Sequence, residues 1–232
     1  MSKEAFHNLL LAELDRSQAL QSRIADDPAF RARRADLRAW QADRLARTYR
    51  DLLESPRFRA AAQFFLLDLY GPKDLGKRVE DVRRIIPVMT RVLPDSGLET
   101  VAHALELNVL SESLDAETAE ALARGPISDE SYAAAYRKVG RADDRARQIA
   151  LIALVGDALD KLTHVPFVGM TLRMMRKPAE LAGLDELQTF LERGYAAFSA
   201  MRGGARQFVS NVVTRERAIS EALFRGDIEA LR

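Results

Sequence analysis

The chain has 232 residues, of which 47% are hydrophobic and 30% charged, with a net charge of +1, as is typical of a globular protein with a core. The absence of cysteine excludes a disulfide framework, a zinc knuckle and a thiol nucleophile. The longest apolar run, residues 149–155, is far shorter than the roughly 20 residues of a membrane span, and residues 1–16 lack a signal-peptide layout. We therefore expect a soluble, cytoplasmic protein without a membrane span.

The charges are unevenly distributed along the sequence. Residues 23–59 contain ten arginines against six acids, a net charge of +4, whereas residues 95–130 contain nine acids against one arginine, a net charge of −8. Blocks of opposite charge favour pairing with each other, either within the fold or between subunits. We therefore expect a homo-oligomer or a protein partner. Nucleic acid is disfavoured, because a nucleic-acid-binding face usually carries one sign of charge.

Apolar residues recur at spacings of three and four, which predicts amphipathic helices. The predicted helices span residues 3–25, 28–54, 58–71, 75–93, 96–115, 143–163, 184–201 and 204–225, with short helices within 115–140 and after Pro166. Asp27 is predicted to cap the second helix ahead of Pro28. The predicted fold class is all-α, a single multi-helical bundle domain with a buried central helix at about 58–71. Residues 1–55 form an N-terminal helical hairpin that can project from the helical core at 56–232.

The helix predicted over 28–54 is the most polar in the chain. Its arginines surround a narrow apolar stripe and are Arg31, Arg33, Arg34, Arg38, Arg44, Arg47 and Arg50. They are interpreted as a solvated face with intrahelical ion pairs or, alternatively, as a basic surface for an acidic partner.

The segment FRAAAQFFLLDLYGP at 58–72 is apolar on nearly every side, which predicts a helix surrounded by other helices. Asp68 lies within it, where a buried carboxylate is costly unless it is paired or hydrogen-bonded. Backbone N–H groups or an arginine can hold Asp68 as a structural brace, or Asp68 can bind a metal or polar ligand in the core. Tyr70 is expected at the edge of the core, with its hydroxyl on a partner or water, and is the candidate for a cofactor contact.

Two further patterns supply candidate metal or acid/base residues. Glu99, His103 and Glu106 share one face of the helix 96–115, but the Glu-x-x-His motif that a di-iron site requires twice occurs only once in the sequence, at residues 4–7. His103 is therefore open to a structural, surface or metal-binding interpretation.

The helix 143–163 carries the second pattern. Its less apolar arc combines small residues with Asp157, Asp160 and His164, which can point into one space. The alternatives are a close helix crossing with hydrogen-bonded carboxylates, or a metal or acid/base face.

Residues 165–178, VPFVGMTLRMMRKP, combine methionines with basic residues. A short helix of this kind either seals the core as a connecting element or lies on a membrane or in a partner's groove. The chain contains no phosphate-binding glycine motif, no GxSxG and only three histidines, so no established catalytic motif is present.

The run FFLLDLYGP at 64–72, with VPFVGMTLRMMRKPAELAGL at 165–184 and LQTFLERGYAAFSAM at 187–201, resembles an uncharacterised bacterial all-helical family carrying an FFLxDLYGP motif. The resemblance implies a domain identity and supplies no substrate.

The function favoured by the sequence is a non-enzymatic interaction or small-ligand-binding module with no assigned cofactor. The alternative is a metal-dependent helical-bundle enzyme. Its candidate residues are Asp68, His103, Asp157, Asp160 and His164, with Glu99 and Glu106 as additional metal ligands. The residues do not decide between a binding protein and an enzyme.

Overall fold

The computed structural model describes residues 3–66, 83, 85, 86 and 95–231. Within these ranges the chain forms eleven α-helices and one short 3-10 helix, and no strand occurs among them. The prediction of an all-α, multi-helical domain is therefore confirmed.

The helices follow the predicted ranges closely. The longer ones are α1 (Lys3–Asp26), α2 (Pro28–Thr48), α6 (Asp95–Ala121), α8 (Ala142–Thr163), α11 (Asp185–Ala200) and α12 (Ala205–Arg225). The shorter ones are α3 (Arg50–Glu54), α4 (Arg59–Phe64), α7 (Asp129–Val139), α9 (Val168–Met174), α10 (Arg176–Leu181) and the 3-10 helix η2 (Glu229–Leu231). The helix predicted over 28–54 is interrupted at Tyr49, and the one predicted over 96–115 continues to Ala121.

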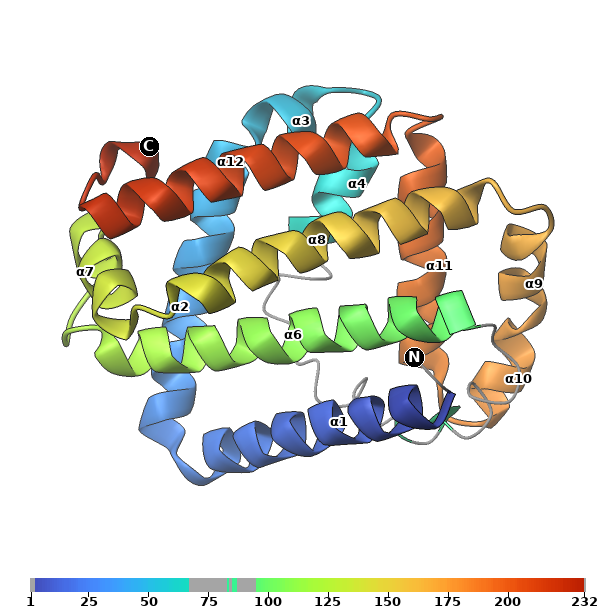
Figure 1. Cartoon of the computed structure of the whole chain (residues 1–232), viewed down its shortest axis with the longest axis horizontal. Helices are drawn as coiled ribbons and strands as arrows, with labels where there is room; N and C mark the ends of the chain where they lie inside the picture. Colours follow the sequence, from blue (N-terminus) through green and yellow to red (C-terminus); the bar gives the residue numbers. More distant parts are fainter. Residues whose placement is uncertain (1–2, 67–82, 84, 87–94, 232) are drawn as a thin grey trace.

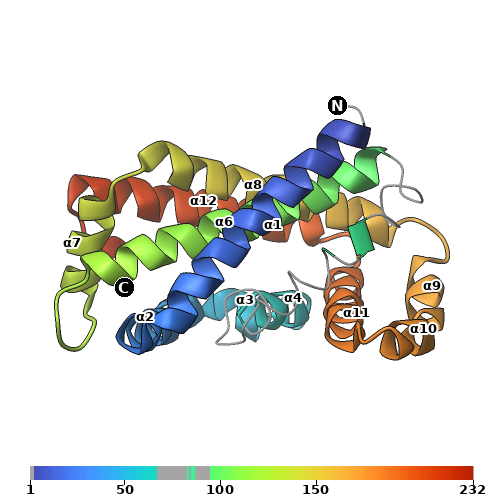
Figure 2. The same ribbon diagram turned by 90° about the horizontal axis from the view of Figure 1, so that it is seen from below.

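The long helices form a layer in which α12, α8, α6 and α1 lie side by side in that order (Figure 1). Seen from below, α2, α3, α4 and α11 lie together on one side of this layer (Figure 2). The helix α2 crosses α6, and α11 crosses α8 while also contacting α4. This arrangement packs two layers of helices on a shared apolar interior, as the all-α class requires.

Local chemistry sets several of the helix ends. The Asp27 side chain accepts a hydrogen bond from the Phe30 N–H at 2.9 Å, which confirms the predicted cap ahead of Pro28. Ser128 and Ser131 cap α7 reciprocally, each side chain accepting from the other's backbone N–H. Gly226 ends α12 with a φ of 86°, a left-handed conformation that glycine adopts without steric cost.

Three apolar clusters hold the layers together. One joins α2, α6, α7 and α12 and includes Leu37, Tyr132 and Leu223. A second joins α2, α3, α4, α8, α11 and α12 around Phe198 and Phe208. The third joins α1 to α6. Burial of these side chains is the main favourable contribution to folding, at about 25 cal/mol for each Å² of apolar surface removed from water.

The described part of the segment predicted as the central helix is α4, followed by Phe65 and Leu66. Ala61, Ala62 and Phe64 are buried, while Gln63 is exposed, so α4 is covered mainly on one side. Residues 67–71 lie outside the described residues.

The N-terminal helices pack directly against α6. Leu10 and Leu14 of α1 are completely buried and contact the cluster that contains Leu98 and Leu105. In Figure 2, α1 crosses α6 at close quarters. Both helices of the hairpin therefore pack against α6, α1 alongside it and α2 across it (Figure 1).

Ion pairs join the acidic block at 95–130 to arginines elsewhere in the same chain. Its acids pair with arginines of α1, α2 and α8 and with the residue preceding α8, in the pairs Arg23–Glu120, Arg34–Glu112, Arg38–Glu112, Arg47–Asp129, Arg141–Glu117 and Arg147–Glu106. The charge blocks seen in the sequence are thus complementary within the fold. In the described part of the chain, no helix combines the length and apolar character needed to cross a membrane.

Candidate functional site

A polar cavity of about 60 Å³ lies between α2, α6, α7, α8 and α12. Its polar lining comes from all five helices and includes Gln41, Arg44, Asp115, Tyr136, Arg145 and Glu216. Polar groups at such a depth lose water on folding, so each needs a partner in the protein or in the cavity. The partners of the charged groups therefore decide which of them are available to a ligand.

Arg44 and Glu216 form a closed ion pair. The Arg44 Nη1 and Nη2 groups donate to Glu216 Oε1 and Oε2 at 2.7 and 3.3 Å, and the Tyr49 hydroxyl donates to Oε1 at 2.7 Å. Burial alone would raise the pKa of Glu216, but the Arg44 guanidinium outweighs it and holds that pKa below the usual range. Both groups are therefore charged at neutral pH and neutralise each other, while the Arg44 Nε is buried without a hydrogen-bond partner among the described residues.

Among the described residues, the hydrogen-bonding partner of the Asp115 carboxylate is neutral. Gln41 Nε2 donates to Asp115 Oδ1 at 2.9 Å. Burial raises the pKa of this carboxyl, against the smaller opposing effects of the Gln41 hydrogen bond and the Arg145 charge. Asp115 is therefore held less firmly in its charged form than Glu216.

Arg145 is buried at the same cavity and makes no ion pair with any carboxylate of the described residues. Its Nη2 donates to Thr118 Oγ1 at 3.1 Å, its Nη1 lies 3.5 Å from Gln148 Oε1, and its guanidinium lies 4.5 Å from the centre of the Tyr136 ring. Its Nε is buried and has no hydrogen-bond partner. Asp115 and Glu216 line the same cavity and act on Arg145 electrostatically without an ion-pair contact, so an anion bound in the cavity would give this buried cation the direct partner it lacks among the described residues.

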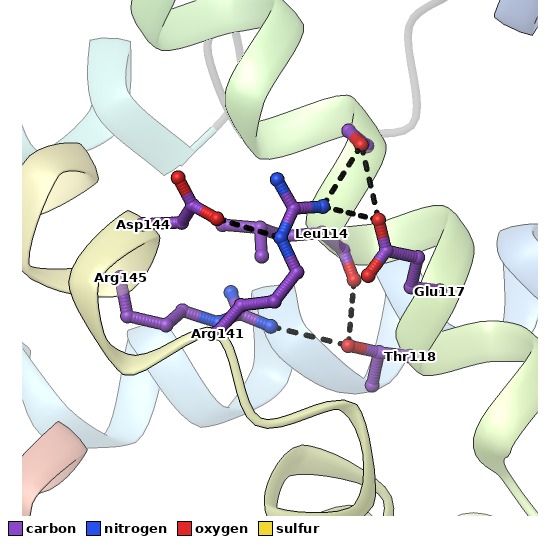
Figure 3. Close-up of polar contacts among 7 residues, drawn as sticks. Leu114, Glu117, Thr118, Arg141, Asp144 and Arg145 are labelled. Carbon is purple, nitrogen blue, oxygen red and sulfur yellow. Dashed lines mark hydrogen bonds and ion pairs between the residues drawn. The ribbon is translucent and has the colours of Figure 1, made fainter.

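The surroundings fix the position of Arg145 (Figure 3). Thr118 donates its hydroxyl proton to the Leu114 carbonyl at 2.7 Å, which leaves its lone pairs to accept from Arg145. Just before α8, Arg141 adopts a left-handed φ of 55° and binds Asp144 and Glu117. These contacts tie the start of α8 to α6, so the Arg145 side chain points into a preformed space.

Charged groups that are buried or partly buried between these helices form one cluster, which we call the interior polar cluster. Its members are the arginines Arg34, Arg38, Arg44 and Arg145 and the carboxylates Glu112, Asp115 and Glu216. Of these, Arg44, Arg145, Asp115 and Glu216 line the cavity itself, so its charges balance when all four are ionised, and protonation of Asp115, which burial favours, leaves one positive charge in excess. The interior polar cluster is therefore suited to an anion.

This cluster was not predicted from the sequence. The arginines of 28–54 were interpreted as a solvated face or, alternatively, as a basic surface for an acidic partner, and the solvated-face interpretation is wrong for Arg34 and Arg44, which are 5% and 7% exposed. A usable signal was present, because Arg34, Gln41 and Arg44 lie at helical spacing with the apolar residues Leu37 and Leu45.

The residues predicted as a site are dispersed in the structure. Asp68 and Tyr70 lie outside the described residues. Glu106 accepts two hydrogen bonds from Arg147, at 2.7 and 2.6 Å, and Glu99 is exposed. His103 is partly buried. Within the described ranges, no three His, Cys, Asp or Glu side chains are grouped so that they could hold a metal ion.

On α8, the small-residue arc forms a close helix crossing. A Cβ added at Gly156 would lie 2.5 Å from Val209 Cγ2, so the absence of a side chain there lets α12 approach α8. Asp157 pairs with Lys161 at 2.7 Å on the exposed surface. Asp160 and His164 share a polar surface hollow, in which His164 Nδ1 lies 2.8 Å from the Asp160 carbonyl oxygen.

Comparison with known proteins assigns the chain to a family but identifies no substrate, ligand or reaction. Neither a curated protein nor a solved structure matches it. The family model described as "Domain of unknown function (DUF8198)" matches residues 20–230, which includes every helix that lines the cavity. The chain therefore belongs to the DUF8198 family.

Proposed function

We propose that this protein is a non-enzymatic small-ligand-binding module that holds a small oxyanion, such as a carboxylate or phosphate group, against Arg145. The observation that carries the proposal is the buried Arg145 guanidinium, which lines a cavity and whose hydrogen-bonding partners among the described residues are neutral. A guanidinium recognises oxyanions through charge-assisted hydrogen bonds, which are about twice as strong as neutral ones.

The size of the cavity limits the ligand. One water molecule needs about 10–15 Å³ of such volume. A cavity of about 60 Å³ therefore accommodates a few waters or one group the size of phosphate or a short carboxylate. Gln148, Tyr136 and Ser220 offer neutral polar atoms beside Arg145. These groups would orient the bound oxyanion without adding charge.

The alternative of a metal-dependent enzyme has less support. The donor pattern for a metal does not occur among the described residues. Asp157 pairs with Lys161, and Glu106 with Arg147, so two of the candidate ligands are engaged elsewhere. The candidate at Asp68 lies outside the described residues and is not part of this proposal.

Calorimetric titration of the full-length protein with inorganic phosphate and with acetate, at constant ionic strength, tests the proposal. One of these probes should bind and raise the melting temperature, because a ligand that binds only the folded state stabilises it. Arg145→Gln should weaken that binding at least about tenfold, since a hydrogen bond to a charged group contributes roughly 1.5–3 kcal/mol.

The matched control is Arg217→Gln on the exposed side of α12, which should leave binding unchanged. The absence of binding by either anion, or equal binding by the Arg145→Gln and wild-type proteins, would overturn the proposal. A melting temperature for Arg145→Gln close to that of wild type confirms that the variant is folded.

Association remains a separate expectation. The homo-oligomer was predicted from charge blocks, and those blocks pair within the chain. Light scattering at low and high salt tests it, because an electrostatic oligomer should dissociate as salt rises. A strict monomer at low salt would contradict it. The expected bacterial origin and cytoplasmic location also stay predictions.

A further inference from the structure

We propose that the end of the molecule formed by α9, α10 and the C-terminal end of α8 binds an anionic lipid surface, with Phe167, Met170 and Met174 entering the lipid. This inference is independent of the oxyanion site, which lies between other helices.

The first observation is an exposed apolar stripe. Met170 and Met174 lie four residues apart on one face of α9, and Phe167 immediately precedes the helix as its N-cap residue. They are 75%, 50% and 71% exposed. Apolar side chains that gather on one exposed face, and are not scattered singly, mark an interaction surface.

The second observation is backbone strain at the start of this stripe. Phe167 has a φ of 68°, in the left-handed region that a bulky residue rarely adopts. The strain is not repaid by burial, because the ring is among the most exposed apolar groups of the described chain. Strained residues that persist in this way are concentrated at sites of binding and catalysis.

The third observation is charge. Residues 161–181 contain four basic residues, Lys161, Arg173, Arg176 and Lys177, against Glu180, but Lys161 pairs with Asp157 and Arg176 with Glu192. Arg173 and Lys177 are exposed and make no ion pair with any described residue. A basic, Met-containing apolar helix matches the charge of an anionic membrane surface and the depth of its headgroup region.

The shape of this region favours a lipid surface over a protein groove. Both views place α9 and α10 at one end of the molecule, beyond α11 and the end of α8 (Figures 1 and 2). The hollow beside it is polar and is lined by Asp160, Lys161, His164, Gly203 and Arg206. Protruding apolar tips next to a polar hollow suit insertion into lipid better than the seating of an apolar partner helix.

Vesicle co-sedimentation of the full chain tests the inference, with vesicles of phosphatidylcholine alone and of equal parts phosphatidylcholine and phosphatidylserine. The protein should bind the anionic vesicles and bind neutral ones much more weakly. Phe167→Gly should lower binding about tenfold, because burying such a side chain contributes about 1.5–3 kcal/mol and 1.4 kcal/mol is a factor of ten. The double variant Arg173→Gln/Lys177→Gln should lower binding to anionic vesicles about tenfold or more.

Phe167→Gly also separates binding from folding, because glycine relieves the left-handed strain and the variant should be at least as thermostable as wild type. The control is Leu154→Gln, an exposed apolar residue of α8 outside the stripe, which should bind vesicles like wild type. Failure to bind anionic vesicles would overturn the inference. A concentration-dependent dimer that Phe167→Gly abolishes, without vesicle binding, would assign the stripe to a second copy of the chain and overturn it as well.

Discussion

Replacing Glu216 by Gln should destabilise the protein strongly, because it removes the only carboxylate paired with Arg44 among the described residues. The Arg44 and Glu216 side chains are 8% and 18% exposed, so water cannot replace the lost charge. The substitution keeps the size of the side chain and an oxygen that can accept from Arg44 and Tyr49. Glu216→Gln therefore measures the effect of losing the negative charge, separately from any change in side-chain size.

The expected magnitude follows from the geometry. Breaking a buried ion pair by removing one partner costs about 3–5 kcal/mol, and the remaining hydrogen bonds favour the lower end of that range. A loss of about 3 kcal/mol is a large part of a typical unfolding free energy of about 5–15 kcal/mol. For a chain of this length it corresponds to a fall in melting temperature of roughly 6–12 °C.

Urea unfolding followed by circular dichroism measures the effect. Glu106→Gln is the control, because its partner Arg147 is 43% exposed and a surface pair contributes about 1 kcal/mol or less. The double variant Arg44→Met/Glu216→Leu should recover most of the stability by removing both charges. A Glu216→Gln protein as stable as Glu106→Gln would refute the reasoning.

The pH dependence provides a second check on the same residue. The folded pKa of Glu216 is lowered, so the stability it contributes is present above its usual 4.5 and is lost as the pH falls through the lowered folded value. Glu216→Gln should therefore lose less stability than wild type in that acid window.

Three further substitutions test other parts of the structure. Gly156→Ala should destabilise by about 1–3 kcal/mol through overpacking against Val209, and adding Val209→Ala should restore part of the loss in urea unfolding; an equally stable single variant would contradict the close crossing. Asp27→Ala should cost about 1 kcal/mol of unfolding free energy by removing the cap of α2, whereas Asp26→Ala should change it little. Asp115→Asn should stabilise the protein increasingly as the pH rises above 3.8, because the raised folded pKa of Asp115 makes the charged form costly there; a stability difference independent of pH would show that burial does not perturb this group.

Most helices could be predicted because their signals are local. The cap at Asp27, the proline that follows it, the serine cap of α7 and the glycine after α12 act within a few residues of the helix ends. The interruption at Tyr49 could not be predicted in this way. Its hydroxyl binds Glu216, which lies far away in the sequence, so the reason for the break belongs to the tertiary structure.

The interior polar cluster was missed for the same physical reason. An arginine at a helical position next to apolar residues can bury its long side chain or extend it into solvent. Which of the two occurs depends on whether another helix supplies an acidic side chain to pair with it. The partners of Arg34 and Arg44 are Glu112 and Glu216, which lie on two different helices. The arc on α8 was partly predictable, because its small residues indicated the close approach that Gly156 makes with Val209. Of the nearby carboxylates, Asp157 pairs locally with Lys161, whereas the Oδ1 of Asp160 is buried without a hydrogen-bond partner in the described part of the chain.

The two arginines that line the cavity differ in a way that bears on function. Arg44 is neutralised within the fold, because Glu216 accepts from both of its terminal nitrogens, although the Nε of Arg44 is buried without a hydrogen-bond partner among the described residues, as is that of Arg145. An ion pair of that kind could be replaced by apolar side chains with little loss of stability. Arg145 lies beside the same space, yet its partners are a hydroxyl, an amide and an aromatic ring. Folding alone would favour an apolar residue at that position, so the charge of Arg145 is better explained by a ligand than by the stability of the fold.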